Sequence, residues 1–255
     1  MQINKNNSVN QSNNLTKENL NSTINNENEI NNSSGDNGSF NDLQNTINSL
    51  PDNSVLNLDQ DYSYNDTGDF TGIIVSKNNF IIDDHGHTLD ANSKNNIVRI
   101  FNITGSKVTL KNLVLKNANV KTKDGGAITN TGQSLNINNI TFINNKAHYG
   151  VVIQNYGTQL TIINSDFTNN QAGCGGAINN NANKSSIHDS SFTQDTVSTY
   201  GGAICNDGNS FTIDNSTFNN NMGNQKGGVI QNNHGTDVII KNSVFTNIMR
   251  IFLVV

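Results

Sequence analysis

Tryptophan is absent from this chain, proline occurs once, and charged residues make up only 14% of its 255 residues. The hydrophobic fraction is 33% and the aromatic fraction 6%, which leaves little apolar surface to offset the chain entropy of an ordinary globular domain. The scarcity of proline keeps nearly every backbone N–H available for strand pairing. The formal net charge of −5 argues against nucleic acid or an anionic membrane as a partner.

Long hydrophobic runs are also missing, as no segment approaches the roughly 20 apolar residues of a membrane span. The chain shows no basic and apolar leader, and the tail 249–255 matches nothing upstream. We therefore expect this tail to be truncated or frameshifted, and the chain to be a fragment of a longer array. The two cysteines, Cys174 and Cys205, are too few to establish a redox compartment. Their positions within their repeats differ by about five strand residues, roughly 15 Å, so the sequence predicts two unpaired thiols.

What the chain does contain is a repeat of the tetrapeptide Gly-Gly-Ala-Ile. Its isoleucines stand at 128, 153, 178, 204 and 230, so that successive copies are separated by 25, 25, 26 and 26 residues. A fixed period in this range is typical of a solenoid. The first glycine of the motif never varies within the chain, which predicts a positive φ there, and the second is replaced once by Val151. The copies lie at Gly125–Ile128, Gly150–Ile153, Gly175–Ile178, Gly201–Ile204 and Gly227–Ile230.

Each repeat contains three short segments that we expect to be strands: the glycine motif, an alternating stretch such as Leu160-Thr-Ile162, and a segment marked by phenylalanine. Segments this short need neighbours above and below them to be stable. We therefore predict an all-β fold, a parallel β-helix in which equivalent residues of successive coils lie one above the other. The phenylalanine positions are Phe142, Phe167, Phe192, Phe218 and Phe245, with Leu115 one coil earlier.

Asparagine recurs at fixed places in the repeat, and we interpret these residues as structural ladders. Stacked amides can donate and accept hydrogen bonds along the axis, and an unsatisfied buried amide would cost about 1–3 kcal/mol. One column follows the marker isoleucines: Asn130, Asn155, Asn180, Asn206 and Asn232. A second precedes the phenylalanines: Asn112, Asn139, Asn164, Asp189, Asn215 and Asn242. A third follows them: Asn117, Asn144, Asn169, Gln194, Asn220 and Asn247.

The N-terminal part divides by composition and period. Residues 1–36 are rich in Asn and Ser and are predicted to be disordered. Apolar residues then recur with helical spacing after Ser39, an expected N-cap with Asp42 in the first turn. This pattern predicts an amphipathic helix over 37–50 that caps the open end of the solenoid. The parallel β-helix is predicted over 51–248.

The combination of Gly-Gly-Ala-Ile with Phe-x-x-Asn, as in Phe142–Asn145, resembles the polymorphic outer membrane protein repeat. The stretch from Asn79 to Asn112 resembles the start of adhesin-like surface proteins of methanogenic archaea. The resemblance covers about residues 38–248 and implies a right-handed, pectin-lyase-like parallel β-helix of roughly seven coils, about 4.8 Å apart. It also implies an extracellular or cell-surface location and an adhesin-like or cell-wall role, with surface glycans or other cell-surface proteins as partners.

The same fold class hosts polysaccharide lyases and hydrolases, so we searched the aligned repeats for catalytic groups. A hydrolase needs two suitably separated carboxylates, and a lyase needs a basic residue together with acidic Ca²⁺ ligands. One outward column places His188, Asp214 and Lys241 on successive coils. These three are the best candidates for chemistry or binding, although an exposed ion-pair ladder explains them as well.

The stretch from Asp83 to His87 is the other cluster of titratable groups, with Asp84 and His85 between them. Such residues can bind metal, but a coil corner around Gly86 accounts for them better. A column of outward threonines, as in ice-binding surfaces, is interrupted at Asn136 and elsewhere. We therefore expect no catalytic site, no metal and no cofactor. The sequence favours a non-enzymatic surface protein, with a polysaccharide lyase or hydrolase as the alternative.

Overall fold

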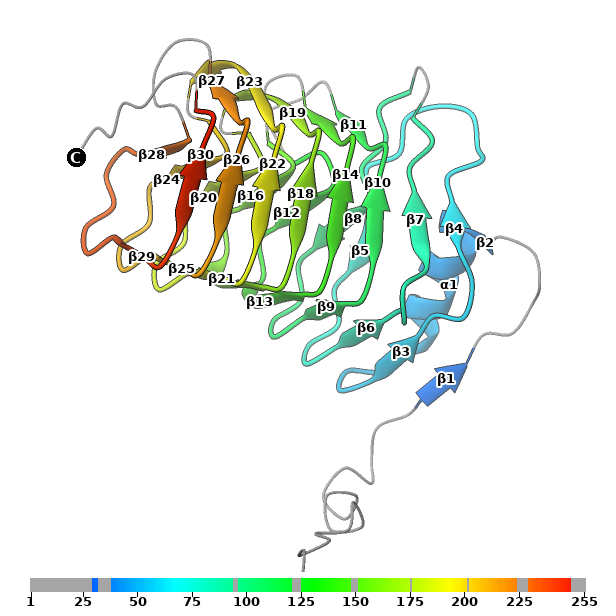
Figure 1. Ribbon diagram of the computed structural model, residues 1–255. Coiled ribbons are helices and arrows are strands. Elements are labelled where there is room, and N and C mark those ends of the chain that lie inside the picture. Colours follow the sequence, from blue (N-terminus) through cyan, green and yellow to red (C-terminus); the bar gives the residue numbers. More distant parts are fainter. Residues whose placement is uncertain are drawn as a thin grey trace, which may run out of the picture.

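The computed structural model describes residues 29–31, 38–93, 96–120, 125–147, 151–174, 176–200, 202–223 and 229–248. These residues wind into a parallel β-helix, in which the strands of successive coils lie side by side in long rows (Figure 1). The strands form four parallel sheets, which we designate A to D. The prediction of a parallel β-helix with about seven coils is confirmed, since sheet D contains seven strands.

Sheet D is built from the strands that follow the glycine motif. Ile128 pairs with Ile153, which pairs with Ile178, and the same register continues to Ile204 and Ile230. The marker isoleucines therefore lie in one column, as the period predicts. The strands are β5 (Ile73–Val75), β8 (Phe101–Ile103), β12 (Ile128–Asn130), β16 (Ile153–Asn155), β20 (Ile178–Asn180), β24 (Ile204–Asn206) and β28 (Ile230–Asn232).

Sheets A and B carry the two other predicted segments of each coil. Period-2 alternation puts Leu110, Ile137 and Ile162 inside sheet A, all fully buried. Sheet A contains β1 (Glu29–Asn31), β3 (Val55–Asn57), β6 (Ile81–Asp83), β9 (Thr109–Lys111), β13 (Gln133–Asn138), β17 (Thr158–Ile163), β21 (Ser186–His188), β25 (Thr212–Asp214) and β29 (Ile239–Lys241). Sheet B contains β2 (Gly38–Ser39), β4 (Tyr62–Ser63), β7 (Thr88–Asp90), β10 (Val114–Lys116), β14 (Thr141–Ile143), β18 (Asp166–Thr168), β22 (Ser191–Thr193), β26 (Thr217–Asn219) and β30 (Val244–Thr246).

Five coils contain a fourth strand in addition to the three that were expected. These strands form sheet C, and most are only two residues long. Each begins shortly after a left-handed corner residue such as Asn144 and buries one small side chain such as Ala147. The sheet comprises β11 (Asn119–Val120), β15 (Lys146–Ala147), β19 (Gln171–Cys174), β23 (Thr196–Tyr200) and β27 (Met222–Gly223).

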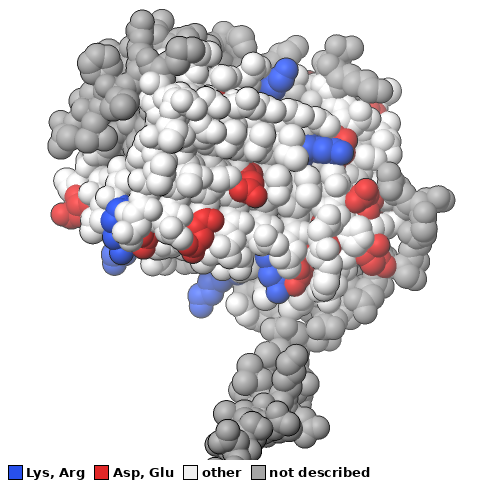
Figure 2. Space-filling view, viewed as in Figure 1, with Lys and Arg blue, Asp and Glu red and all other residues white. Residues whose placement is uncertain are grey.

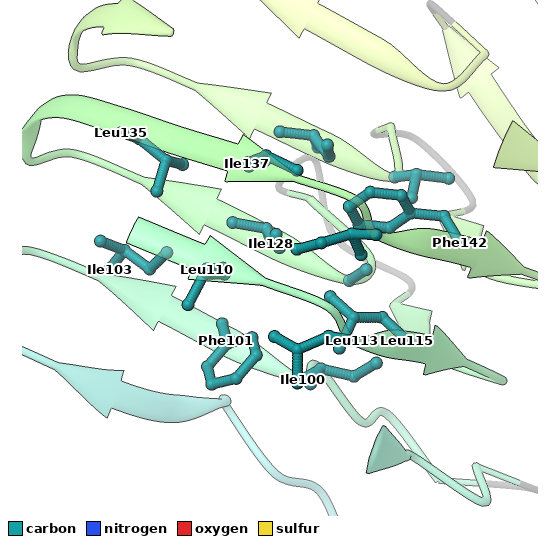
Figure 3. Packing of buried hydrophobic residues seen from close by; sticks show 14 of the residues in the cluster. Ile100, Phe101, Ile103, Leu110, Leu113, Leu115, Ile128, Leu135, Ile137 and Phe142 are labelled. Atoms are coloured by element: carbon teal, nitrogen blue, oxygen red, sulfur yellow. The ribbon is translucent and has the colours of Figure 1, made fainter. Parts of the chain in front are cut away.

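The core is one continuous column of apolar side chains from all sides of the coil. Figure 3 shows Leu110, Ile128 and Phe142 pointing into the space between the strands. From Phe142 onward the phenylalanine rings stack along the axis, with centroids 4.5–4.8 Å apart and planes within 7° of parallel. This spacing equals the distance between paired strands, about 4.8 Å. The strand spacing therefore sets the ring spacing.

The predicted capping helix is α1 (Phe40–Ser49), which lies across the N-terminal end of the coils (Figure 1). Ser39 Oγ accepts a hydrogen bond from the Asp42 N–H, and the Asp42 carboxylate accepts one from the Ser39 N–H, a complete capping box. Phe40, Leu43 and Ile47 face the core and are buried.

At this end, two short strands and one side chain cover the free edges of β3, β4 and β5. Strand β1 pairs with β3 in sheet A, and β2 pairs with β4 in sheet B. In sheet D the Gln44 side chain of α1 takes the place of a strand: its amide donates to Ile74 O at 3.0 Å and accepts from Ile74 N at 2.6 Å. Strand β1 falls within the segment 1–36 predicted to be disordered, so Glu29–Asn31 depart from that prediction. Residues 1–28 and 32–36, like the tail 249–255, lie outside the described residues.

Gly125, the first glycine of its motif, does not have the positive φ that we expected. A Cβ at Gly125 would lie 1.8 Å from Ile128 O and 2.8 Å from Gln154 N. Close backbone approach, within and between coils, is therefore what requires glycine here. The other first glycines, at 150, 175, 201 and 227, lie outside the described residues.

The asparagine column after the marker isoleucines is the predicted ladder. The Nδ2 of each of the first four members donates to the Oδ1 of the next coil, at distances of 2.7–3.0 Å. Its first four members are fully buried, so these bonds satisfy amides that have no access to water. The column consists of Asn130, Asn155, Asn180, Asn206 and Asn232.

The second column is not a continuous ladder, and this part of the prediction is corrected. Its members occupy surface corners with φ between 47° and 57°, a backbone conformation that asparagine tolerates better than most residues. Two rungs link members of the column, Asn139 to Asn112 at 2.7 Å and Asn215 to Asp189 at 2.6 Å. The column is Asn112, Asn139, Asn164, Asp189, Asn215 and Asn242; the third column, Asn117, Asn144, Asn169, Gln194, Asn220 and Asn247, has the same left-handed backbone.

Candidate functional site

The three outward residues singled out from the sequence are neighbours in the structure. His188 of β21 lies in register with Asp214 of β25, and Asp214 with Lys241 of β29. Lys241 Nζ is 3.2 Å from Asp214 Oδ2, and His188 Nδ1 is 4.0 Å from the same oxygen. The alignment of the repeats therefore predicted this juxtaposition correctly.

The surroundings of Asp214 favour the ionised form of its carboxylate. Asn242 Nδ2 donates to Asp214 Oδ1 at 2.8 Å, while Lys241 holds the other oxygen. The hydrogen bond from Asn242, followed by that from Lys241 and the charges of Lys241 and His188, lowers the pKa of Asp214. A general acid or base needs a pKa near the working pH, so this carboxylate is poorly placed for proton transfer.

The same arrangement occurs twice more, near the N-terminal end. Lys111 Nζ lies 2.5 Å from Asp83 Oδ2 and Asn112 Nδ2 donates to Asp83 Oδ1 at 2.6 Å. In sheet B, Lys116 and Asn117 hold Asp90 at 3.4 and 2.8 Å. In each case a lysine and the asparagine that follows it bind the carboxylate of an aspartate on the preceding coil, and the lysine is in register with that aspartate. We call this arrangement the Asp/Lys-Asn clamp, and its recurrence favours a role in stacking coils.

The cluster from Asp83 to His87 forms a coil corner. The His87 N–H donates to Asp84 O at 3.3 Å, and His85 and Gly86 have left-handed backbones, which makes a tight turn. His87 Nδ1 lies 2.9 Å from Asp84 Oδ1, whereas His85 is exposed and 4.0 Å from Asp83. Within the described part of the chain, no group of three or more His, Cys, Asp or Glu is arranged to hold a metal ion.

Asp84 is fully buried behind His87, and its Oδ2 has no hydrogen-bond partner. Burial, followed by the charges of Asp61 and Asp83, raises the pKa of Asp84 to about 8. At neutral pH the side chain is therefore largely the neutral acid, and its Oδ1 still accepts the hydrogen bond from His87. This corner presents no free carboxylate to a substrate.

The charged residues do not gather on the face shown in Figure 2; they are few, and several of opposite sign lie next to each other. The sequence did not predict a cleft of about 380 Å³ beside sheet C. Asparagine amides dominate its lining, and Lys146 contributes an ammonium group. It is lined by Asn92, Ser93, Asn117, Ala118, Asn119, Asn144 and Lys146. Two of these, Asn117 and Asn144, had been interpreted only as structural, and no motif in the sequence marks the group as a site.

The cysteines lie in different sheets, Cys174 on β19 of sheet C and Cys205 on β24 of sheet D. Cys174 pairs in register with Tyr200, and Cys205 with Asn179 and Gln231. The two residues are therefore not partners along either ladder. The presence of two free thiols stays a prediction, which thiol titration of the denatured, unreduced protein would test.

One match to a known protein family falls within the repeat region and is about one coil long. Residues 164–181 match the Chlamydia polymorphic membrane protein repeat. This stretch runs from the corner residue Asn164 through β18 and β19 to the end of β20, so it includes one phenylalanine strand and one glycine motif. No curated protein matches the chain. The match supports the repeat character of the sequence.

The structure also bears on membrane association. No helix among the described residues is both long and apolar enough to cross a bilayer. Helix α1, with 10 residues, serves as the cap described above.

Proposed function

We propose that this chain is a non-enzymatic repeat protein of the cell surface, with an adhesin-like or cell-wall scaffold role. The observation that carries the proposal is the recurrence of the Asp/Lys-Asn clamp at Asp83, Asp90 and Asp214. The outward acids that most resembled a reactive site are thereby assigned to coil stacking. The match to a membrane protein repeat and the resemblance to adhesin-like proteins support a surface location.

Irregular outward columns over regular inward ones also support a scaffold whose surface can vary. On sheet A the register column that contains His188 also contains Lys111, Asn138 and Ile163. The neighbouring inward positions are all apolar, and all except Ile240 at the C-terminal end are buried. A surface of this kind can change its partner without disturbing the core.

In this proposal the cleft beside sheet C is where a glycan binds. Asparagine amides offer both donors and acceptors to sugar hydroxyls, and Lys146 adds a positive charge for an acidic sugar. The cleft volume, about 380 Å³, lies in the range of small-ligand sites, roughly 300–1,000 Å³.

The test is binding of the purified chain to immobilised neutral and acidic glycans and to whole cells. We expect Lys146→Ala to weaken binding to an acidic glycan severalfold. Lys184→Ala is the control, since it removes an exposed lysine of equal charge that lies outside the cleft and outside the Asp/Lys-Asn clamps. Failure of the folded protein to bind any glycan or cell would contradict the adhesin role. Equal weakening by both substitutions would contradict the cleft as the site.

A polysaccharide lyase or hydrolase is the second candidate, because the outward column brings His188, Asp214 and Lys241 together. If the chain is non-enzymatic, as proposed, incubation with acidic polysaccharides should release no reducing or unsaturated ends. Cleavage that is lost in Asp214→Ala, with folding shown to be intact, would establish the enzyme instead.

A further inference from the structure

A second buried ladder runs directly behind the stacked phenylalanines, and the sequence reasoning missed it. Its members stand three residues after the first four phenylalanines of the stack and are fully buried. In each one, a side-chain oxygen accepts from the backbone N–H of the preceding coil, at 2.9–3.0 Å. The members are Asn145, Asn170, Asp195 and Asn221.

The asparagines of this ladder make a further bond with the amide nitrogen. Asn145 Nδ2 donates to Leu115 O at 2.9 Å, Asn170 Nδ2 to Phe142 O at 3.1 Å, and Asn221 Nδ2 to Phe192 O at 2.8 Å. The acceptor is always the carbonyl of the central residue of the preceding sheet B strand. Side-chain oxygen and nitrogen therefore have fixed and different roles at every coil.

Asp195 has a carboxyl oxygen where its neighbours have an amide nitrogen. Its Oδ1 accepts from Asn170 N and Nδ2, both at 2.9 Å, while its Oδ2 is buried and has no hydrogen-bond partner. By the register of sheet B, the carbonyl that corresponds to Phe142 O and Phe192 O is that of Phe167. If Asp195 were ionised, its Oδ2 would face the carbonyl oxygen of Phe167, and both groups are acceptors. Neither oxygen would be solvated by water, so the arrangement would be unfavourable.

We infer that Asp195 is a neutral carboxylic acid in the folded protein, that its Oδ2–H replaces the amide donor toward Phe167 O, and that its ionisation loosens this coil. The fold would thus contain a pH-sensitive element, held firmly in acid and weakened as the pH rises. A proton on Oδ2 makes Asp195 equivalent to asparagine in this position, with one donor and one acceptor.

The electrostatic surroundings agree with this inference. Burial raises the pKa of Asp195 to about 7, even though the hydrogen bonds from Asn170 act to lower it. The ladder neighbours Asn170 and Asn221 are uncharged. Among the described side chains of β18, β19, β22, β23, β26 and β27, Asp166 is the one charged group; it is exposed and hydrogen-bonded to Ser191. None of the described side chains on these strands is therefore a cation that could hold Asp195 as a carboxylate.

The sign of the effect follows from the proton balance. Unfolded Asp195 releases its proton near the usual value of about 4, whereas the folded chain retains it to about pH 7. Between these values the folded state binds more protons than the unfolded state, so stability falls as the pH rises. Above the folded pKa the loss is complete and the contribution becomes constant.

The experiment compares urea-unfolding midpoints of the whole chain from pH 4 to pH 8.5 in the wild type and Asp195→Asn. We expect equal midpoints near pH 4 and a higher midpoint for Asp195→Asn above pH 7. Comparing the two proteins cancels the contribution of Asp84, which has a raised pKa of its own. Asp189→Asn, at an exposed corner, is the matched control and should follow the pH profile of the wild type.

A second variant keeps the inference testable if the Asp195→Asn protein does not fold. Asn221→Asp places another acid one coil further along and should add a further pH-dependent decrease of the midpoint. Infrared spectra should also show a protonated carboxyl band in the wild type at pH 6 that is weaker in Asp195→Asn. A difference between wild type and Asp195→Asn that is the same at every pH, or no pH-dependent effect of Asn221→Asp, would overturn the inference.

Discussion

Asn155 Nδ2 donates to Asn180 Oδ1 across 3.0 Å, and both side chains are completely buried. The next rung, from Asn180 to Asn206, is 2.9 Å long. Asn180 Nδ2 also donates to Ala182 O at 2.9 Å, and its Oδ1 accepts from the Ala182 N–H. One side chain therefore joins three coils and closes the turn that follows its own strand.

Replacement of Asn180 by alanine should consequently be costly. The change leaves buried donors and acceptors on both neighbouring coils without partners, at about 1–3 kcal/mol for each unsatisfied group. We expect a clear decrease in the free energy of unfolding measured with urea. Asn138→Ala, on the outward face of β13, is the control and should change stability by less than about 0.5 kcal/mol. Similar losses in the two variants would contradict a special role for the ladder.

The sequence predicted the ladder at Asn180 because a strict period leaves little choice of register. It predicted the contact between Asp214 and Lys241 for the same reason. It did not distinguish Asn144 from Asn145, although the first is a surface corner and the second a buried ladder member. That difference depends on which residue adopts the left-handed conformation, and adjacent asparagines give no sign of it.

Other features could not be predicted from the sequence because they join residues that share no repeat position. Gln44 bonds the edge of β5 through contacts across 30 residues, and its place on an exposed helix face carries no signal. The sequence predicted that the first glycine is needed for a positive φ. At Gly125 glycine is needed instead because a Cβ would collide with the carbonyl oxygen of Ile128. The cleft around Lys146 likewise brings Asn92 and Ser93, which follow β7, next to residues of the repeat.

The phenylalanine stack leads to a prediction about packing. Phe192 is fully buried, and its ring lies between Phe167 and Phe218, with centroids 4.6 and 4.7 Å away. Phe192→Ala should cost about 3–5 kcal/mol because the paired strands cannot close the cavity. Phe192→Leu should cost much less, since Leu115 occupies the equivalent place in an earlier coil. Equal midpoints in urea for the two variants would show that the cavity is not the cause.

Gly125 tests the requirement for close backbone approach. A methyl group there would lie 1.8 Å from Ile128 O, and at Gly126 it would lie 2.8 Å from Lys146 O. We expect Gly125→Ala to reduce the free energy of unfolding by about 1–3 kcal/mol or more through overpacking. Gly126→Ala should cost less, because Val151 fills the corresponding place in the next coil. A larger loss at Gly126 than at Gly125 would contradict this explanation.

The Asp/Lys-Asn clamp at Asp83 predicts a dependence on pH opposite in sign to that of Asp195. Burial acts to raise the pKa of Asp83, but the hydrogen bonds from Lys111 and Asn112 and the charge of Lys111 outweigh it, so the pKa is lowered. The folded state therefore holds fewer protons than the unfolded state as the pH falls below about 4. The stabilisation is present at neutral pH and is lost in acid, as the pH passes through the folded pKa.

Asp83→Asn should accordingly destabilise the protein at pH 7, by an amount near the upper end of that for surface ion pairs, about 1 kcal/mol. As the pH falls through the folded pKa of Asp83, the urea midpoints of the variant and the wild type should converge, because the carboxyl of the wild type becomes protonated. Asp214→Asn should have a smaller effect, since its carboxylate is more exposed than that of Asp83, 22% against 11%. Added salt should reduce the effect at both sites, and more at Asp214. A loss at Asp83 that is the same in acid and at pH 7 would mean that the charge of the clamp contributes nothing to coil stacking.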